Sequence, residues 1–172
     1  TSTLCAAGTF AANAGQSACT PAPIGSYVGS VGASVAAQCA VGTFQPLTGA
    51  SACLVSPPGS FVNTSGATAA TPCSPGTFTP LNGAISCTPS QPGAFVAGAG
   101  ASAATQCAAG SYQPNTGSTS CLQASPGFFV ATQGATSQSA CAVGFQSLAG
   151  AAACVNIAGD PNGDPDGDGI PP

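Results

Sequence analysis

A strict spacing of cysteine and glycine is the feature that most limits the fold of this chain. Gaps of 14 and 20 residues alternate between its ten cysteines, until a last gap of 13. Glycine recurs every 17 residues from Gly8 to Gly144, and an aromatic residue follows two places later in eight of these nine copies. Such a period indicates tandem structural repeats. We therefore number nine repeats, and the places within each, from the following first residues: Cys5, Ala22, Cys39, Ser56, Cys73, Ser90, Cys107, Ala124 and Cys141.

Each repeat has the sequence signals of a β-hairpin. A turn is expected at the first glycine, which follows proline in four copies, for example at Pro58 and Gly59. A short extended run such as 42–45 comes next, followed by a second turn and a second short strand. One such hairpin is too small to be stable alone, so neighbours have to stack. The predicted fold is all-β with little regular secondary structure: an elongated array of nine 17-residue, disulfide-stapled, hairpin-like repeats in residues 1–158, with a 34-residue double unit and a separate acidic tail in 159–172.

The apolar side chains predict where the repeats pack. The aromatic residues at place 6 are expected to form a stacked core, and a sugar-binding stripe along these rings is the functional alternative. Place 7 holds Val28, Val62, Val96 and Val130 in even repeats, whereas three odd repeats have Gln at or next to this place. Because adjacent residues of a strand face opposite sides, these valines predict an apolar outer stripe for contact with another subunit. A thicker core on that side is the equal alternative.

The cysteines allow two pairings. They occupy places 1 and 15 of odd repeats only, and even repeats have Ala or Ser at both places. If the two places touch, both should be Cys together or small together, as they are. This favours the pairs Cys5–Cys19, Cys39–Cys53, Cys73–Cys87, Cys107–Cys121 and Cys141–Cys154. The rival pairing joins Cys19 to Cys39 and so on, and leaves Cys5 and Cys154 free for covalent polymerisation; spacing alone does not decide between them.

Charge is confined to the tail. The chain has no Lys, Arg or His, and its only acids are Asp160, Asp164, Asp166 and Asp168. Without cations it cannot replace the counterions of phosphates, which excludes nucleic-acid binding, and it cannot form a basic membrane-surface helix. The repeats also lack the acids, bases and activated nucleophiles of most enzymes, so we expect no enzymatic activity. Leu, Ile, Val and Phe number only 28 of 172 residues, so disulfides are expected to supply much of the order.

The cysteines also predict the compartment. Ten at regular spacing indicate an oxidising setting, so an extracellular, secreted or cell-surface location is expected. The sequence has no methionine and no signal-peptide pattern, from which we expect a processed chain or a fragment. No apolar run approaches the length of a membrane span. Asn63, with Thr64 and Ser65, forms an N-glycosylation sequon, and the many Ser and Thr residues near Pro are candidates for O-glycans.

The run from Cys39 through Gly42, Thr43 and Phe44 to Cys53 resembles the ephrin-receptor-like cysteine-rich repeat. It also resembles the first half-module of tumour-necrosis-factor-receptor domains. The resemblance covers residues 5–154 in phase, and it implies a hairpin-like turn closed by a disulfide between places 1 and 15, in an elongated rod. This chain lacks the further cysteines that those families carry beside each closing one, and it lacks their charged surface. Cytokine or ephrin binding is therefore not implied.

The tail resembles the calcium-binding Asp-rich repeats of thrombospondin type 3 and related bacterial surface proteins. Its alternating side-chain oxygens suit a hard cation such as calcium. The candidate ligands are Asp160, Asn162, Asp164, Asp166 and Asp168. The last three match places 1, 3 and 5 of such a loop, with Gly169 at place 6, but no bidentate acid follows to complete it. A flexible, solubilising terminus is the alternative.

Three functions are compatible with this pattern. The first is a structural subunit of an extracellular self-assembling filament, sheath or surface layer, which would be a homopolymer. A near-zero net charge promotes association, and strand edges without Lys lack protection against pairing with other strands. The alternative is a disulfide-rich stalk or receptor-like binding module. An ice-binding repeat protein fits less well, because its flat rows of hydroxyls are reduced here to a single column that fails at Ala94 and Phe128.

Overall fold

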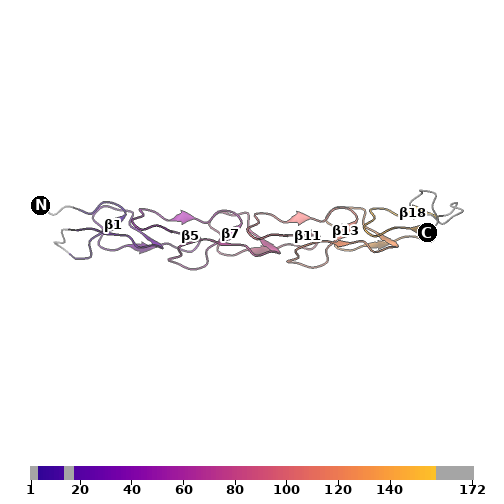
Figure 1. Ribbon diagram of the computed structural model, residues 1–172, viewed down its shortest axis with the longest axis horizontal. Helices are drawn as coiled ribbons and strands as arrows, with labels where there is room; N and C mark the ends of the chain where they lie inside the picture. The colour runs from indigo at the N-terminus through magenta and orange to yellow at the C-terminus, as the bar shows by residue number, and fades with distance from the viewer. Residues whose placement is uncertain (1–3, 14–17, 158–172) are drawn as a thin grey trace. The chain divides into compact units, whose positions relative to one another are not determined.

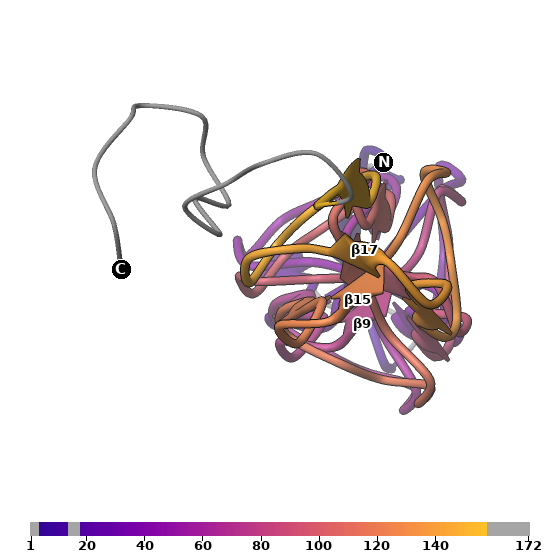
Figure 2. The same cartoon turned by 90° about the vertical axis from the view of Figure 1, so that its right-hand side faces the viewer.

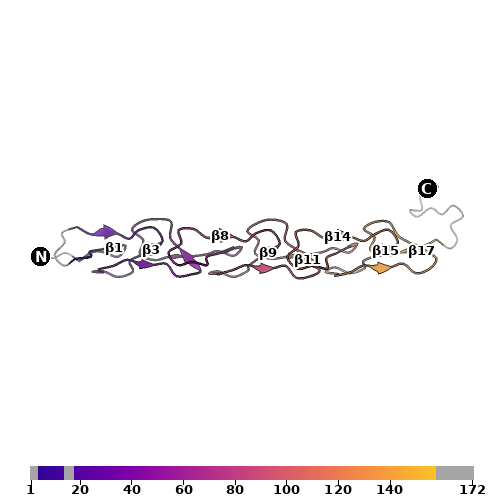
Figure 3. The same ribbon diagram turned by 90° about the horizontal axis from the view of Figure 1, so that it is seen from below.

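The computed structural model describes residues 4–13 and 18–157. Within them every regular element is a two-residue strand and no helix forms, so the predicted all-β array of nine hairpins is confirmed (Figures 1 and 3). The first strands are β1 (Thr9–Phe10), β3 (Ser26–Tyr27), β5 (Thr43–Phe44), β7 (Ser60–Phe61), β9 (Thr77–Phe78), β11 (Ala94–Phe95), β13 (Ser111–Tyr112), β15 (Phe128–Phe129) and β17 (Phe145–Gln146). The second strands are β2 (Thr20–Pro21), β4 (Ala37–Gln38), β6 (Leu54–Val55), β8 (Thr71–Pro72), β10 (Thr88–Pro89), β12 (Thr105–Gln106), β14 (Leu122–Gln123), β16 (Ser139–Ala140) and β18 (Val155–Asn156).

The chain divides into two compact units. Unit 1 comprises Thr1–Ser74, Phe78–Thr88 and Ala99–Ala103, and unit 2 comprises Pro75–Thr77, Pro89–Gly98 and Ala104–Pro172. The same hairpin recurs in both units. The boundary predicted between residues 158 and 159 lies outside the described residues.

The turn before the first strand explains the first glycine of each repeat. In repeat 3, Thr43 N donates to Ala40 O at 3.0 Å across a turn in which Gly42 has φ 80°. A turn with positive φ at its third residue favours glycine, which adopts this conformation without a Cβ clash. The strand that follows pairs in antiparallel register, with Thr43 opposite Val55 and Phe44 opposite Leu54.

Backbone hydrogen bonds join consecutive repeats. Two bonds run from each repeat to the next: the backbone N at place 4 donates to the O at place 7, and the N at place 7 donates to the O at place 12. A third bond runs back, from the N at place 11 of the next repeat to the O at place 1. Between the first two repeats, in unit 1, these pairs are Gly8 N and Val28 O (2.8 Å), Ala11 N and Ala33 O (3.1 Å), and Gly32 N and Cys5 O (2.8 Å). Between the last two, in unit 2, they are Gly127 N and Ser147 O (3.1 Å), Val130 N and Ala151 O (3.0 Å), and Gly150 N and Ala124 O (2.8 Å). Figure 2 shows β17 next to β15, in agreement with these hydrogen bonds.

Places 1 and 7 form the buried core. The most completely buried side chains include Cys39, Ser56, Cys73, Ser90 and Cys107, all at place 1. The valines at place 7 are also buried, with 2–3 % exposure: Val28, Val62, Val96 and Val130. They therefore belong to a thicker core, and the prediction of an apolar outer stripe is wrong. Each first strand contains only places 5 and 6, so the alternation of faces that holds within a strand does not extend to place 7.

The aromatic rings do not form the centre of the core, contrary to the prediction. From Phe10 to Phe129 they are only half-buried. The reason is the close approach of the backbones. A Cβ on Gly8 would lie 2.2 Å from Gly49 O, two repeats further on. Repeats that approach this closely leave room for small side chains at the centre and place the rings at its border.

The ninth repeat departs from the others in register. Strand β17 places Phe145 at place 5 and Gln146 at place 6, where the other repeats have the ring. The residue that this repeat lacks is therefore missing after the strand, and Gly150 follows Gly144 by six residues instead of seven. Phe145 is 42 % exposed, and Gln146 Nε2 is buried without a hydrogen-bond partner in the described part of the chain. The ring column thus ends at Phe129.

Candidate functional site

Disulfide bonds close the odd-numbered repeats. The bonded pairs are Cys5–Cys19, Cys39–Cys53, Cys73–Cys87, Cys107–Cys121 and Cys141–Cys154, with Cα–Cα distances of 5.6–5.8 Å. These distances lie in the usual range for a disulfide. The structure thus contains the pairing within repeats, and it has no free cysteine among its described residues.

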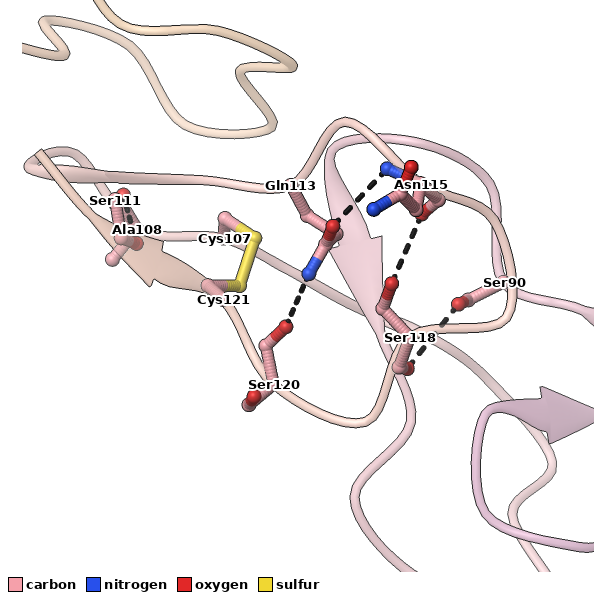
Figure 4. The surroundings of a disulfide bond; sticks show 9 residues. All are labelled: Ser90, Cys107, Ala108, Ser111, Gln113, Asn115, Ser118, Ser120 and Cys121. Carbon is pink, nitrogen blue, oxygen red and sulfur yellow. Dashed lines mark hydrogen bonds between the residues drawn. A yellow bond between two sulfur atoms is a disulfide. The ribbon is translucent and has the colours of Figure 1, made fainter.

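A buried amide braces the disulfide-bonded hairpin of repeat 7. Gln113, at place 7, has 6 % exposure and lies near the Cys107–Cys121 bond (Figure 4). Its Nε2 donates to Ser120 O at 2.7 Å, and its Oε1 accepts from Asn115 N at 3.1 Å. Buried amides need such partners, so this side chain ties the second turn of the repeat to its first strand.

Repeat 3 contains the same brace. Gln45 Nε2 donates to Ala52 O at 2.8 Å, and Gln45 Oε1 accepts from Leu47 N at 3.1 Å. The disulfide-bonded repeats that carry Gln at place 7 therefore alternate with repeats that carry Val there. The alternation has a structural explanation in the core, because both types of residue are buried.

Two shallow hollows in unit 1 both have Tyr27 in their lining. They have volumes of about 380 and 360 Å³, and their linings include Ser30 on one side and Gln38 and Thr43 on the other. A Cβ on Gly29 would lie 3.5 Å from Tyr27 Cε2, so the glycine leaves one edge of the ring uncovered. The walls combine an aromatic ring with amide and hydroxyl groups, in a segment without any charged side chain. Such walls suit a neutral ligand.

Sequence reasoning missed the close contact between glycines. In seven repeats, a Cβ on the first glycine would lie 2.0–2.5 Å from the carbonyl oxygen of the second glycine two repeats later. No other residue fits such an approach of two backbones. The signal was present, because the second glycine recurs in every repeat and even in the shortened ninth, but the sequence does not show which repeat it meets.

The remaining predicted site residues lie at the surface or outside the described part of the chain. Asn63 is exposed directly after the buried Val62, so its side chain is accessible for glycosylation. The candidate calcium ligands Asp160, Asn162, Asp164, Asp166 and Asp168 lie outside the described residues. Residues 4–13 and 18–157 contain no group of three or more His, Cys, Asp or Glu side chains that could hold a metal ion. Nor do they include a helix long and apolar enough to cross a membrane.

Part of the chain is similar to a known protein family. A family model described as tyrosine-protein kinase ephrin type A/B receptor-like matches residues 93–141. This segment contains the hairpins from β11 to β16 and the Cys107–Cys121 bond. The curated proteins contain no match to the chain. Residues 93–141 are thus similar to an ephrin-receptor-like cysteine-rich repeat, as their pattern of Cys, Gly and aromatic residues predicts.

Proposed function

We propose that this chain is a disulfide-rich, receptor-like module displayed outside the cell, where it binds a neutral ligand. The observation that carries the proposal is the hairpin closed by Cys107 and Cys121, because it lies in the segment similar to ephrin-receptor-like repeats. Disulfides persist in oxidising compartments, which supports an extracellular or cell-surface location. The stapled core is a rigid scaffold, and ligands of such scaffolds usually bind the exposed turns between its elements.

The hollows beside Tyr27 are the binding face in this proposal. Neither contains a charged group that could select an ionic ligand. The ring offers an apolar surface, and Ser30, Gln38 and Thr43 offer donors and acceptors around it. A mostly apolar hollow with a few polar groups is the usual form of a small-molecule site. An uncharged oligosaccharide, which has apolar C–H faces and many hydroxyls, fits this chemistry.

Binding of the disulfide-intact protein to an array of neutral and acidic oligosaccharides tests the proposal. We expect binding to neutral members, weakened at least tenfold by Tyr27→Ala. Tyr112→Ala is the matched control, because it removes the ring from the same place of repeat 7 and should leave binding unchanged. Equal binding by the two variants, or a preference for acidic sugars, would contradict the Tyr27 site. Failure of an antibody to label intact cells of the source would contradict the extracellular module itself.

A second candidate function is a self-assembling subunit of an extracellular filament, sheath or surface layer. The exposed aliphatic side chains of the repeats favour it. Leu47, Leu81, Leu54 and Val55 are 50–68 % exposed, and the sequence has no charged residue before Asp160. Exposed apolar surface that lacks charge is prone to association. Electron microscopy of concentrated protein, with and without calcium, should show filaments or sheets, and a field of monodisperse monomers under both conditions would contradict this function.

A further inference from the structure

The last two repeats leave open a surface that is filled, in each earlier repeat, by the repeat two places further along the chain. From Gly8 to Gly110 the first glycine of each repeat is buried, and a Cβ there would lie within 2.5 Å of a carbonyl oxygen two repeats later. Gly127 and Gly144 have the same backbone conformation, with φ 80° and 83°, but they are only half-buried and a Cβ on either would meet no atom of the described residues within 4 Å. No described residue therefore fills these two places, which have the backbone conformation adapted to close contact.

Side-chain exposure at the ninth repeat agrees with this. Val143 is fully exposed, whereas Ile24 and Val41, at the same place of repeats 2 and 3, are 53 % and 49 % exposed. Cys141 is half-buried, whereas Cys107, at the same place of repeat 7, is 1 % exposed. A following repeat would be expected to cover both side chains of the ninth repeat.

The backbone groups that join consecutive repeats are also without their usual partners here. In the ninth repeat these groups are Gly144 N, Ser147 N and Cys141 O. The described residues supply no partner for them of the kind that Gly127 N, Val130 N and Ala124 O have in the eighth repeat. The ninth repeat therefore carries all three backbone groups with which each earlier repeat binds the next one.

We infer that this end binds the first repeat of a second copy of the chain, in a head-to-tail contact. The inference rests on the second proposed function, self-assembly. The occupant follows from continuity with the internal interface. Ala11 O is at the place whose carbonyl accepts from the preceding repeat, so it would accept from Gly144 N, and Gly32 O would lie against the Gly144 Cα. A contact between two different surfaces leaves one of each free, so it repeats from copy to copy and forms an open filament unless the rotation between copies closes a ring.

Sedimentation velocity of the full, disulfide-intact chain over a range of concentrations tests the contact. We expect association that grows with concentration and is weakened at least tenfold by Gly144→Asn. Asparagine tolerates positive φ better than other side chains, and its Cβ would occupy the space required by Gly32 O of the second copy. Gly98→Asn is the control, because a Cβ on Gly98 also meets no described residue within 4 Å, but Gly98 lies within the array at ordinary φ. It should associate like the wild type.

A second variant guards against misfolding of the first. Val143→Asp places a charge on a fully exposed side chain, so it should leave the monomer unchanged and oppose a contact that buries it. Val31→Asp, at a side chain that is 63 % exposed, is its control. Circular dichroism and thermal unfolding establish that each variant is folded. If the wild type stays monomeric, both self-assembly and this contact are overturned. If the wild type assembles and folded Gly144→Asn and Val143→Asp assemble equally well, self-assembly stands and the contact is wrong.

Discussion

At the residue scale, the first glycine of a repeat is required for two reasons, a positive φ and a close backbone contact, and the two can be separated. Gly59 has φ 82°, and a Cβ there would lie 2.0 Å from Gly100 O, whereas Gly144 has φ 83° and no atom of the described residues lies within 4 Å of its Cβ position. Gly144→Ala should lower the free energy of unfolding by about 1–2 kcal/mol, the usual cost of a left-handed conformation. Gly59→Ala should cost roughly 1–3 kcal/mol more, because the two backbones must also move apart. Guanidinium denaturation of dilute, disulfide-intact protein measures both, and equal losses would contradict a role for close backbone packing.

The ninth repeat contains a destabilising residue that two substitutions should correct. Gln146 occupies the ring place, and its buried Nε2 has no partner in the described part of the chain. An unsatisfied buried donor costs about 1–3 kcal/mol. Phe145→Thr combined with Gln146→Phe restores the Thr-Phe strand of repeats 3 and 5, so we expect the free energy of unfolding to rise by about 1–2 kcal/mol. Phe145→Thr alone retains the unpaired donor and is the control; a double variant no more stable than this control would refute the explanation.

At the element scale, even repeats form the hairpin without a disulfide. Ser56 and Ala70 hold the places that cysteines hold in repeat 3, and Ser56 is completely buried as Cys39 is. Ser56→Cys with Ala70→Cys should therefore form a sixth bond without strain. A loop of this length is expected to raise the free energy of unfolding by about 3 kcal/mol. Mass spectrometry of non-reduced peptides and denaturation with and without reductant measure the result. A bond that forms without stabilising the chain would show that even repeats differ in backbone from odd ones.

The hairpins were predictable from sequence because their causes are local. Glycine at a positive-φ turn and a hydroxyl-aromatic strand recur at fixed spacing, and the joint substitution of both cysteines in even repeats favours pairing within a repeat. The core was not predictable in the same way. The alternation of faces ends with the two-residue strand, so it does not predict the side of Val62, at place 7, which is buried. The rings lie at the border of the core because the backbones of Gly59 and Gly100 approach each other closely. Those contacts join repeats that are distant in sequence, and a period alone does not say which repeat meets which.

At the scale of the whole molecule, the described residues are ordered without a single ionisable acid or base among Asp, Glu, His, Lys and Arg. Their order comes from five disulfides, from backbone hydrogen bonds between repeats, and from a narrow core of small side chains. Hydrogen bonds between neutral groups and apolar burial depend little on ionic strength, in contrast to ion pairs at a surface. The same lack of Lys and Arg removes every cleavage site for trypsin-like proteases, which suits a protein displayed outside the cell.

This composition makes the pH dependence of stability a test of the tail. Stability changes with pH only where folded and unfolded chains bind different numbers of protons. The nine repeats offer no such group between about pH 2 and about pH 7, so denaturation midpoints should be flat over this range. The control replaces all four acids by Asn: Asp160→Asn, Asp164→Asn, Asp166→Asn and Asp168→Asn. It should give the same flat profile. If the wild type alone loses about 1 kcal/mol or more as the pH falls from about 5 to about 2, the pKa of at least one tail carboxyl is lowered in the folded chain. The acidic tail would then pack on the repeats, and the independence of the repeats from charge would be wrong.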